Sequence, residues 1–118
     1  RIASPEALHG GETVIIRSHG EAKCVLDAIR EKDAKIVDST CPKVQKIQEI
    51  VHQAEQEGRK PLIIGDPHHP EVLGVAGWCT APLVFQNQEE IRAWLCAEPS
   101  PGNAVYGCIS DNLHTKVF

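Results

Sequence analysis

Short β-type runs of apolar residues alternate along the chain with longer segments of helical periodicity. Five runs predict strands, at residues 13–17, Lys35–Asp38, Pro61–Gly65, Leu83–Phe85 and from Ala104 to about Ile109. Four segments between them predict helices, at Glu21 to about Lys32, Pro42 to about Gly58, Glu71 to about Trp78 and Gln88 to about Cys96. Repeated strand-helix units favour an α/β fold: a mostly parallel sheet of about four to five strands, with helices on both faces.

The helix from Pro42 has the clearest pattern of the four. Its apolar positions recur at three- and four-residue steps: Val44, Ile47, Val51 and Ala54. Proline suits the first turn of a helix, and Gly58 suits its end. The next predicted helix is weaker, because Gly74 and Gly77 each cost about 1 kcal/mol in a helix interior.

The length of 118 residues corresponds to one domain. We therefore predict a single α/β domain over residues 1–118. The chain starts at Arg1 and contains no methionine, so we expect it to be excised from a larger multidomain protein. No apolar run approaches the roughly 20 residues of a membrane span.

The charge and the cysteine content indicate which kinds of partner and which cellular compartment to expect. The net charge is −4 and the basic residues are scattered, which argues against nucleic acid binding, since that needs a clustered basic face. The five cysteines include no Cys-x-x-Cys pair and are odd in number. This usage predicts a reducing, cytoplasmic setting.

Three polar blocks each follow a predicted strand and open a predicted helix. They are Ser18-His19-Gly20, Thr40-Cys41-Pro42 and His69-Pro70-Glu71. Strand-to-helix turns of a parallel sheet gather at the carboxyl ends of its strands, where open α/β folds bind ligands. The sequence therefore predicts that His19, Cys41, His69 and Glu71 share one site.

Each block has a chemical interpretation and a plainer alternative. Cys41, as the residue before the first helical turn, would have a stabilised thiolate suited to a metal or a cluster, or it is a small buried filler. His69 would bind an anion beside a helix N-terminus, or it only caps the helix. Glu71 would act chemically, or it only complements the helix dipole.

The blocks together resemble the LytB/IspH family of 4-hydroxy-3-methylbut-2-enyl diphosphate reductases. The resemblance runs from about Val14 to about Trp78. It rests on three motifs in order: Ile15-Ile16-Arg17-Ser18-His19-Gly20, Asp38-Ser39-Thr40-Cys41-Pro42-Lys43-Val44 and Gly65-Asp66-Pro67-His68-His69-Pro70-Glu71-Val72-Leu73-Gly74.

The resemblance implies an enzyme of three similar α/β domains around a 4Fe-4S cluster, with one cysteine ligand from each domain. This chain resembles the middle domain, and Cys41 would be its ligand. His19 and His69 would bind the substrate diphosphate, and Glu71 would help to deliver the proton with which the allylic hydroxyl leaves as water. The products would be isopentenyl and dimethylallyl diphosphate. The implied partners are the other two domains and an external electron donor such as ferredoxin or flavodoxin, and the chain alone would be inactive.

One segment departs from the family. Members tend to carry a Gln-Thr-Thr turn whose threonine hydroxyl assists the glutamate, whereas this chain reads Gly107-Cys108-Ile109-Ser110-Asp111-Asn112. Ser110 is therefore the candidate for a substrate-binding hydroxyl.

Two alternatives come from other classes of protein. A zinc hydrolase would use His19, Cys41 and His69 as ligands and Glu71 as general base. A non-catalytic α/β binding module would use the same polar residues only to cap helices.

Overall fold

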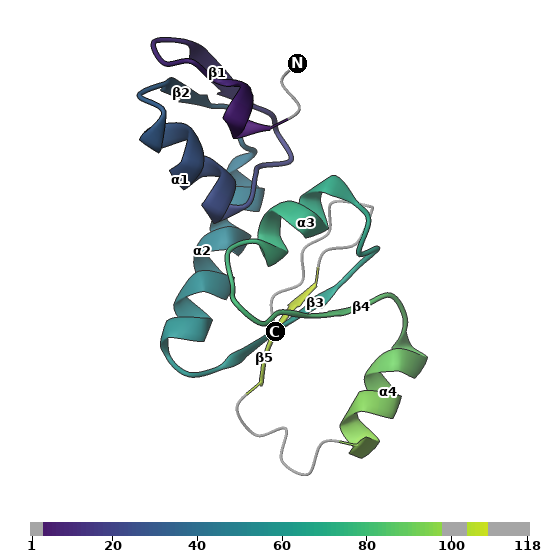
Figure 1. Ribbon diagram of the computed structural model, residues 1–118. Coiled ribbons are helices and arrows are strands. Elements are labelled where there is room, and N and C mark those ends of the chain that lie inside the picture. Colours follow the sequence, from purple (N-terminus) through teal and green to yellow (C-terminus); the bar gives the residue numbers. More distant parts are fainter. Residues whose placement is uncertain (1–3, 98–103, 109–118) are drawn as a thin grey trace.

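Strands and helices follow one another in the predicted order in a computed structural model, which describes residues 4–97 and 104–108 (Figure 1). Its elements are the 3-10 helix η1 (Pro5–Ala7), β1 (Thr13–Ile16), α1 (Lys23–Glu31), β2 (Lys35–Asp38), α2 (Pro42–Gln56), β3 (Lys60–Ile64), α3 (Pro70–Ala76), β4 (Leu83–Phe85), α4 (Gln88–Ala97) and β5 (Ala104–Cys108). All strand pairs are parallel, so the predicted α/β class is confirmed.

The strands form two sheets rather than the one sheet of four to five strands that the sequence suggested. β1 pairs with β2, and β3 lies between β4 and β5 in a separate sheet. Helix α2 connects them and leads away from the first sheet (Figure 1). Hydrophobic periodicity identifies strands but not their partners, which is why the division was not visible in the sequence.

We call η1, β1, α1 and β2 the N-terminal lobe, and the elements from α2 to β5 the C-terminal lobe. The N-terminal lobe has its own core, formed by Leu8, Ile16, Leu26 and Ile29. Helix α1 covers the face of the sheet that carries Ile16. On the other face Ile15 and Val37, which are paired in register, are 67% and 40% exposed, so this sheet carries a helix on one face only among the described residues.

The C-terminal lobe has a deeper core around β3. Its buried residues come from α2, β3 and α3: Val44, Ile47, Val51, Ile63, Val72 and Val75. Ile63 and Val75 are 0% exposed. The apolar stripe of α2 therefore packs as its periodicity predicted, and α2 ends at Gln56, close to the expected stop at Gly58.

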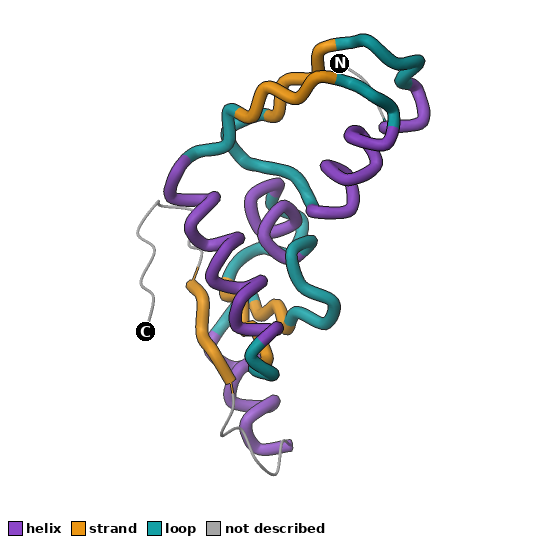
Figure 2. The backbone as a smooth tube through the Cα atoms, turned by 90° about the vertical axis from the view of Figure 1, so that its left-hand side faces the viewer, coloured by secondary structure: helices purple, strands orange, loops and turns teal. Residues whose placement is uncertain are grey.

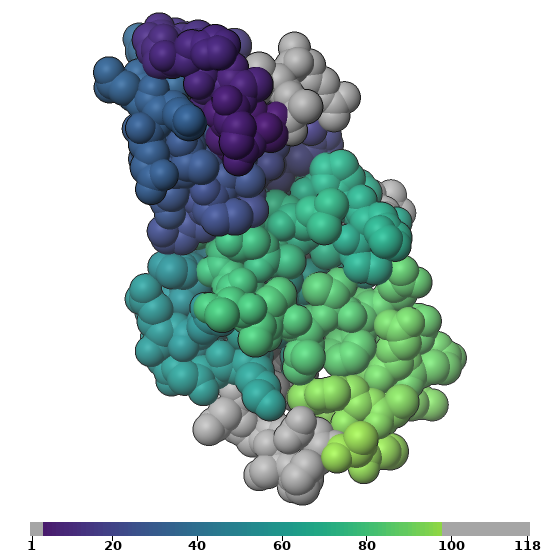
Figure 3. All heavy atoms as spheres, viewed as in Figure 1, coloured from purple at the N-terminus to yellow at the C-terminus, as the bar shows by residue number. Residues whose placement is uncertain are grey.

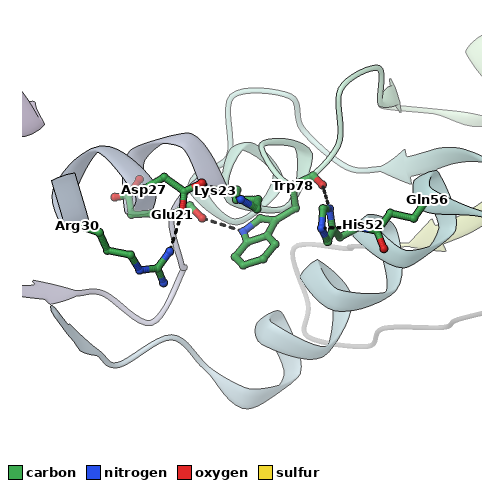
Figure 4. Close-up of polar contacts among 7 residues, drawn as sticks. All are labelled: Glu21, Lys23, Asp27, Arg30, His52, Gln56 and Trp78. Atoms are coloured by element: carbon green, nitrogen blue, oxygen red, sulfur yellow. Dashed lines mark hydrogen bonds and ion pairs between the residues drawn. The ribbon is translucent and has the colours of Figure 1, made fainter.

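The two lobes meet where the loop after β1 and the start of α1 lie against α3. Trp78 packs against both cores, and its Nε1 donates a hydrogen bond of 3.0 Å to the backbone oxygen of Glu21 (Figure 4). The Lys23 amide donates to Gly77 O at 3.1 Å. A Cβ on Gly77 would overlap Ala22, so this glycine lets the end of α3 and the start of α1 approach closely. Trp78 O also contacts His52 Nδ1 of α2 at 3.1 Å.

The paired lobes give an elongated molecule with principal-axis extents of 51 × 29 × 21 Å. The N-terminal lobe forms one end, and the β3 sheet and α4 lie toward the other (Figures 2 and 3). In the part of the chain that the structure describes, no helix has the length and apolar character to cross a membrane. The prediction of a single domain over residues 1–118 stays a prediction. Ser110 lies outside the described residues.

Candidate functional site

His19 lies in the loop that follows β1. The loop closes through a hydrogen bond of 3.0 Å from the Gly20 amide to Arg17 O. Gly20 has φ +75°, a left-handed conformation that disfavours residues with a side chain. His19 is half-buried, and its Nδ1 is a buried atom that has no hydrogen-bond partner among the described residues. The tight turn therefore fixes the backbone of His19 and turns one edge of its ring inward.

Cys41 is the N-cap of α2, as the sequence predicted. Pro42 occupies the first turn, and the Cys41 amide donates to Ser18 O at 2.9 Å, which joins the loops after β1 and β2. The sulfur makes no capping hydrogen bond and the residue is half-buried. The thiol is thus held at the N-terminal end of a 15-residue helix.

Asp38 and Thr40 brace the turn that leads into Cys41. The Asp38 carboxylate accepts hydrogen bonds from the amide and hydroxyl of Thr40. Burial alone would raise the pKa of Asp38, but these bonds, that from Gln45 and the charge of Arg30 outweigh it and lower the pKa below its usual value. Asp38 is therefore a charged brace for the turn.

His69 is the N-cap of α3, again as predicted. Its Nδ1 accepts a hydrogen bond of 3.3 Å from the Glu71 amide. An imidazole nitrogen that accepts carries no hydrogen, so the ring proton lies on Nε2, which can donate to a ligand. Glu71 is half-buried in the first turn, and among the described residues no hydrogen bond or ion pair engages its carboxylate.

The two histidines come together across the junction of the lobes. Their ring centroids lie 6.3 Å apart with an interplanar angle of 80°. Gly74 makes this approach possible, because a Cβ there would lie 3.0 Å from His19 O and 3.4 Å from Gly20 O. From the sequence, Gly74 was expected to weaken the helix, whereas the structure shows that α3 needs this glycine to pack on the His19 loop.

The predicted polar blocks therefore converge, but by a different route from the one expected. The sequence placed them on one edge of one sheet. In the structure the loops of His19 and Cys41 belong to the first sheet, and His69 follows β3 of the second. The site lies where the two sheets' strand ends face each other, and its assembly depends on how the lobes dock.

Among the cysteines of residues 4–97, Cys41 is the candidate metal ligand. Burial raises the pKa of Cys79 to about 11, with Glu55 adding to the rise, which keeps this thiol protonated and a poor ligand. Cys24 and Cys96 are exposed. In residues 4–97 no three His, Cys, Asp or Glu side chains lie together as a metal site, so a zinc site of His19, Cys41 and His69 is not formed.

One residue at the junction escaped the sequence analysis. Gln48 of α2 is only 4% exposed, and its Nε2 is buried with no hydrogen-bond partner in the described part of the chain. This nitrogen lies 2.5 Å from the position of a Cβ on Gly20. The signal was present in the sequence, because a glutamine interrupts the core-facing stripe between Val44 and Val51.

Two lobes of parallel strands and helices, with histidines facing each other across their junction, define the class as a multi-lobed α/β protein. The family model described as LytB protein matches residues 2–109. The chain belongs to the LytB family, so the resemblance seen in the sequence is confirmed.

Curated relatives share the name 4-hydroxy-3-methylbut-2-enyl diphosphate reductase. The one from Alkaliphilus oremlandii is 50% identical over 81 residues, which make up 67% of this chain and 29% of the relative. The one from Thermoanaerobacter sp. is 45% identical over 85 residues, 72% of this chain and 30% of the relative. The chain thus spans about 30% of the length of these relatives.

Solved structures agree with this assignment. A structure of (E)-4-hydroxy-3-methyl-but-2-enyl diphosphate reductase, titled the terminal enzyme of the non-mevalonate pathway, matches with a TM-score of 0.71 and 33% identity, over 92% of this chain and 38% of that one. The reductase from Plasmodium falciparum matches with a TM-score of 0.79 over 96% of this chain and 35% of that one. At 20% identity the second shows the fold alone.

Proposed function

We propose that this chain is part of a longer iron-sulfur reductase that removes the hydroxyl group of 4-hydroxy-3-methylbut-2-enyl diphosphate and yields isopentenyl and dimethylallyl diphosphate. The observation that carries the proposal is the convergence of His19 and His69, 6.3 Å apart, at a junction to which Cys41 is tied through Ser18. The relatives named 4-hydroxy-3-methylbut-2-enyl diphosphate reductase support the choice of substrate.

His19 and His69 bind the diphosphate in this proposal. They come from opposite lobes and present imidazole edges at one place. His69 has its Nδ1 occupied by the Glu71 amide, so its Nε2–H is the donor for an anionic oxygen. Two imidazoles at this spacing suit two neighbouring phosphate oxygens.

Glu71 supplies a proton to the leaving hydroxyl. The overall step consumes two electrons and two protons, breaks the carbon–oxygen bond and releases water. Glu71 stands two residues from His69, which would hold the diphosphate of the same small molecule. A carboxyl group within reach of the departing oxygen acts as a general acid, a contribution of about 10²- to 10⁴-fold in rate.

A 4Fe-4S cluster fits the donor that this chain offers, with Cys41 as one of its three cysteine ligands. The thiol is half-buried at the N-cap of a 15-residue helix and makes no capping hydrogen bond. When bound, the cluster supplies the two electrons of the reduction. The remaining ligands belong to parts of the longer protein outside this chain.

The proposal also includes a further substrate contact, the partners of this chain and the cellular compartment. The hydroxyl group of Ser110 binds the substrate. The other two domains of the enzyme complete the site, and an external donor such as ferredoxin or flavodoxin delivers electrons. We place the enzyme in the cytoplasm, in keeping with the free thiols of Cys24, Cys41, Cys79 and Cys96 among the described residues.

Anaerobic reconstitution of the full-length parent protein tests the cluster. Iron and sulfide should give a brown protein whose visible absorption is lost in Cys41→Ser, while Cys24→Ser, at an exposed thiol, should keep it. Stoichiometric zinc and no cluster would refute the reductase function. The 118-residue chain alone should show no turnover.

Substrate binding is tested by a matched pair of neighbours. His69→Asn keeps a residue that can cap α3 but removes the imidazole, and it should raise KM for the diphosphate by about tenfold or more. His68→Asn, at an exposed neighbour, should leave KM unchanged. Equal effects of the two histidine changes would contradict the assigned roles.

The role of Glu71 as a proton donor is tested by Glu71→Gln. This change should lower kcat by about 10²-fold or more with a smaller change in KM.

A further inference from the structure

Gln48 is a polar residue at a core position. It lies on the face of α2 that also carries Val44, Ile47 and Val51, and it is 4% exposed. Its Nε2 is buried and makes no hydrogen bond to any described residue. Buried polar groups are almost always paired, so this amide needs a partner within the junction.

A second buried nitrogen without a partner among the described residues belongs to His19. His19 Nδ1 is buried although the residue itself is half-buried, and His19 directly precedes Gly20. Gln48 Nε2 lies 2.5 Å from the Cβ position of Gly20, and Thr40 Cγ2 lies 3.1 Å from it. The absence of a side chain at Gly20 therefore lets the Gln48 amide lie against the backbone of the residue next to His19.

The two nitrogens are complementary only through an intermediary. An amide nitrogen donates, and an imidazole nitrogen without hydrogen accepts. A water molecule can accept from the amide and donate to the ring at once, and polar surroundings of this kind retain buried water. A direct bond is not made, since both atoms lack a partner.

We propose that Gln48 is a positioning residue for His19: its Nε2 donates to a buried water molecule, which donates to His19 Nδ1 and holds the ring proton on Nε2. His69 is in the same tautomer, because its Nδ1 accepts from the Glu71 amide. Both imidazoles then offer an Nε2–H donor across the junction. The inference rests on the proposed function only for what they bind, a diphosphate.

The tautomer of His19 can be measured without substrate or cluster. In the ¹⁵N-labelled full-length protein, long-range ¹H–¹⁵N spectra should show His19 as the Nε2–H form with widely separated ring nitrogen shifts, assigned through their loss in His19→Asn. Gln48→Met keeps the length of the side chain and removes the donor. It should move the two shifts toward each other. The matched control Gln53→Met, on the exposed face of the same helix, should leave them unchanged. Unchanged His19 shifts in Gln48→Met would overturn the proposal.

Stability distinguishes positioning from a purely structural role. If the Gln48 amide were truly unpaired, replacing it with methionine would raise the thermal unfolding midpoint, because an unsatisfied buried group is removed. A paired amide predicts an unchanged or lower midpoint. A raised midpoint with unaltered His19 shifts overturns the proposal. If Gln48→Met does not fold, Gln48→Asn, whose amide is one methylene too short to reach the water, should give the same change in the His19 shifts.

Binding of inorganic pyrophosphate separates this inference from the proposed function. Gln48→Met should raise its Kd by about threefold to tenfold, the effect of one weakened hydrogen bond. In turnover the change should appear in KM, with kcat within about twofold. If the unaltered protein binds no pyrophosphate, the diphosphate role of His19 fails, and the spectra alone decide the role of Gln48. If it binds and Gln48→Met binds equally well, positioning is refuted.

Discussion

The two lobes differ in how completely they bury their strands. In the C-terminal lobe β3 has a partner strand on each side and α2 packed against it, and Ile63 is 0% exposed. In the N-terminal lobe the two strands pair only with each other within the part of the chain that the structure describes, and Ile15 is 67% exposed. Each lobe therefore has a core of its own, but the strands of the N-terminal lobe are less completely covered than β3.

This difference determines where the candidate site is vulnerable. His19 belongs to the less buried lobe and His69 to the more buried one. Their separation is set by the packing of the His19 loop on Gly74 and of Ala22 on Gly77. A change that loosens the junction should therefore disturb ligand binding even when both lobes remain folded.

The largest loss should follow from the core of the C-terminal lobe. Ile63→Ala removes a fully buried side chain from β3 and should lower the free energy of unfolding of that lobe by about 2–5 kcal/mol. Native-state hydrogen exchange of the β3 amides measures it. Exchange in α1 should change less, and an equal change in both lobes would show that they unfold as one unit.

Next in size is a change that forces the lobes apart. Gly77→Ala places a methyl group against Ala22, an overpacking that should cost about 1–3 kcal/mol. Exchange of the amides from Gly20 to Glu31 should speed up, and pyrophosphate should bind more weakly. Ala22→Gly in the same protein should restore part of the loss. No rescue in this double variant would contradict the close contact.

A smaller effect should come from the indole that joins the two cores. Trp78→Phe removes the hydrogen bond to Glu21 O and should cost about 1 kcal/mol at the junction, with faster exchange in α1 (Figure 4). Trp94→Phe is the matched control, since Trp94 packs on Phe85 within the C-terminal lobe. A similar effect of both variants on α1 would refute the bridging role.

The smallest effect should come from the open face of the first sheet. Ile15→Thr keeps a β-branched residue at a position that is 67% exposed, so in this 118-residue chain it should change stability by less than about 0.5 kcal/mol. Thermal unfolding measures the change. A loss above about 1 kcal/mol would mean that this face is covered and would remove the contrast between the lobes.

Local structure was predictable because its causes are local. The stripe of Val44, Ile47 and Val51 identified α2, and prolines at the first helical position located the starts of α2 and α3. The pairing of strands was not predictable, because it depends on contacts between distant segments. The packing role of Gly77 was not predictable for the same reason, since its neighbour Ala22 lies 55 residues earlier in the chain.

The residues of the candidate site were predictable from the sequence, but the way in which the fold brings them together was not. His19, Cys41 and His69 were named from their places after strands, and the structure brings the histidines together and ties Cys41 to the same loop. Gln48 was missed because a single polar residue in an apolar stripe gains meaning only when its buried neighbours are known. The roles of the site residues, including Ser110 beyond the described residues, stay predictions.

The pair of histidines on opposite lobes also links ligand occupancy to the relative position of the lobes. A ligand held by both His19 and His69 can bind only the docked arrangement, so it must favour that arrangement over any in which the lobes separate. The coupling is reciprocal: whatever tightens the docking lowers the Kd of such a ligand by the same factor. At a concentration 100 times its Kd, a ligand of this kind would stabilise the docked state by about 2.7 kcal/mol. Under the proposed function, the substrate would thereby help to hold together the two lobes that carry His19 and His69.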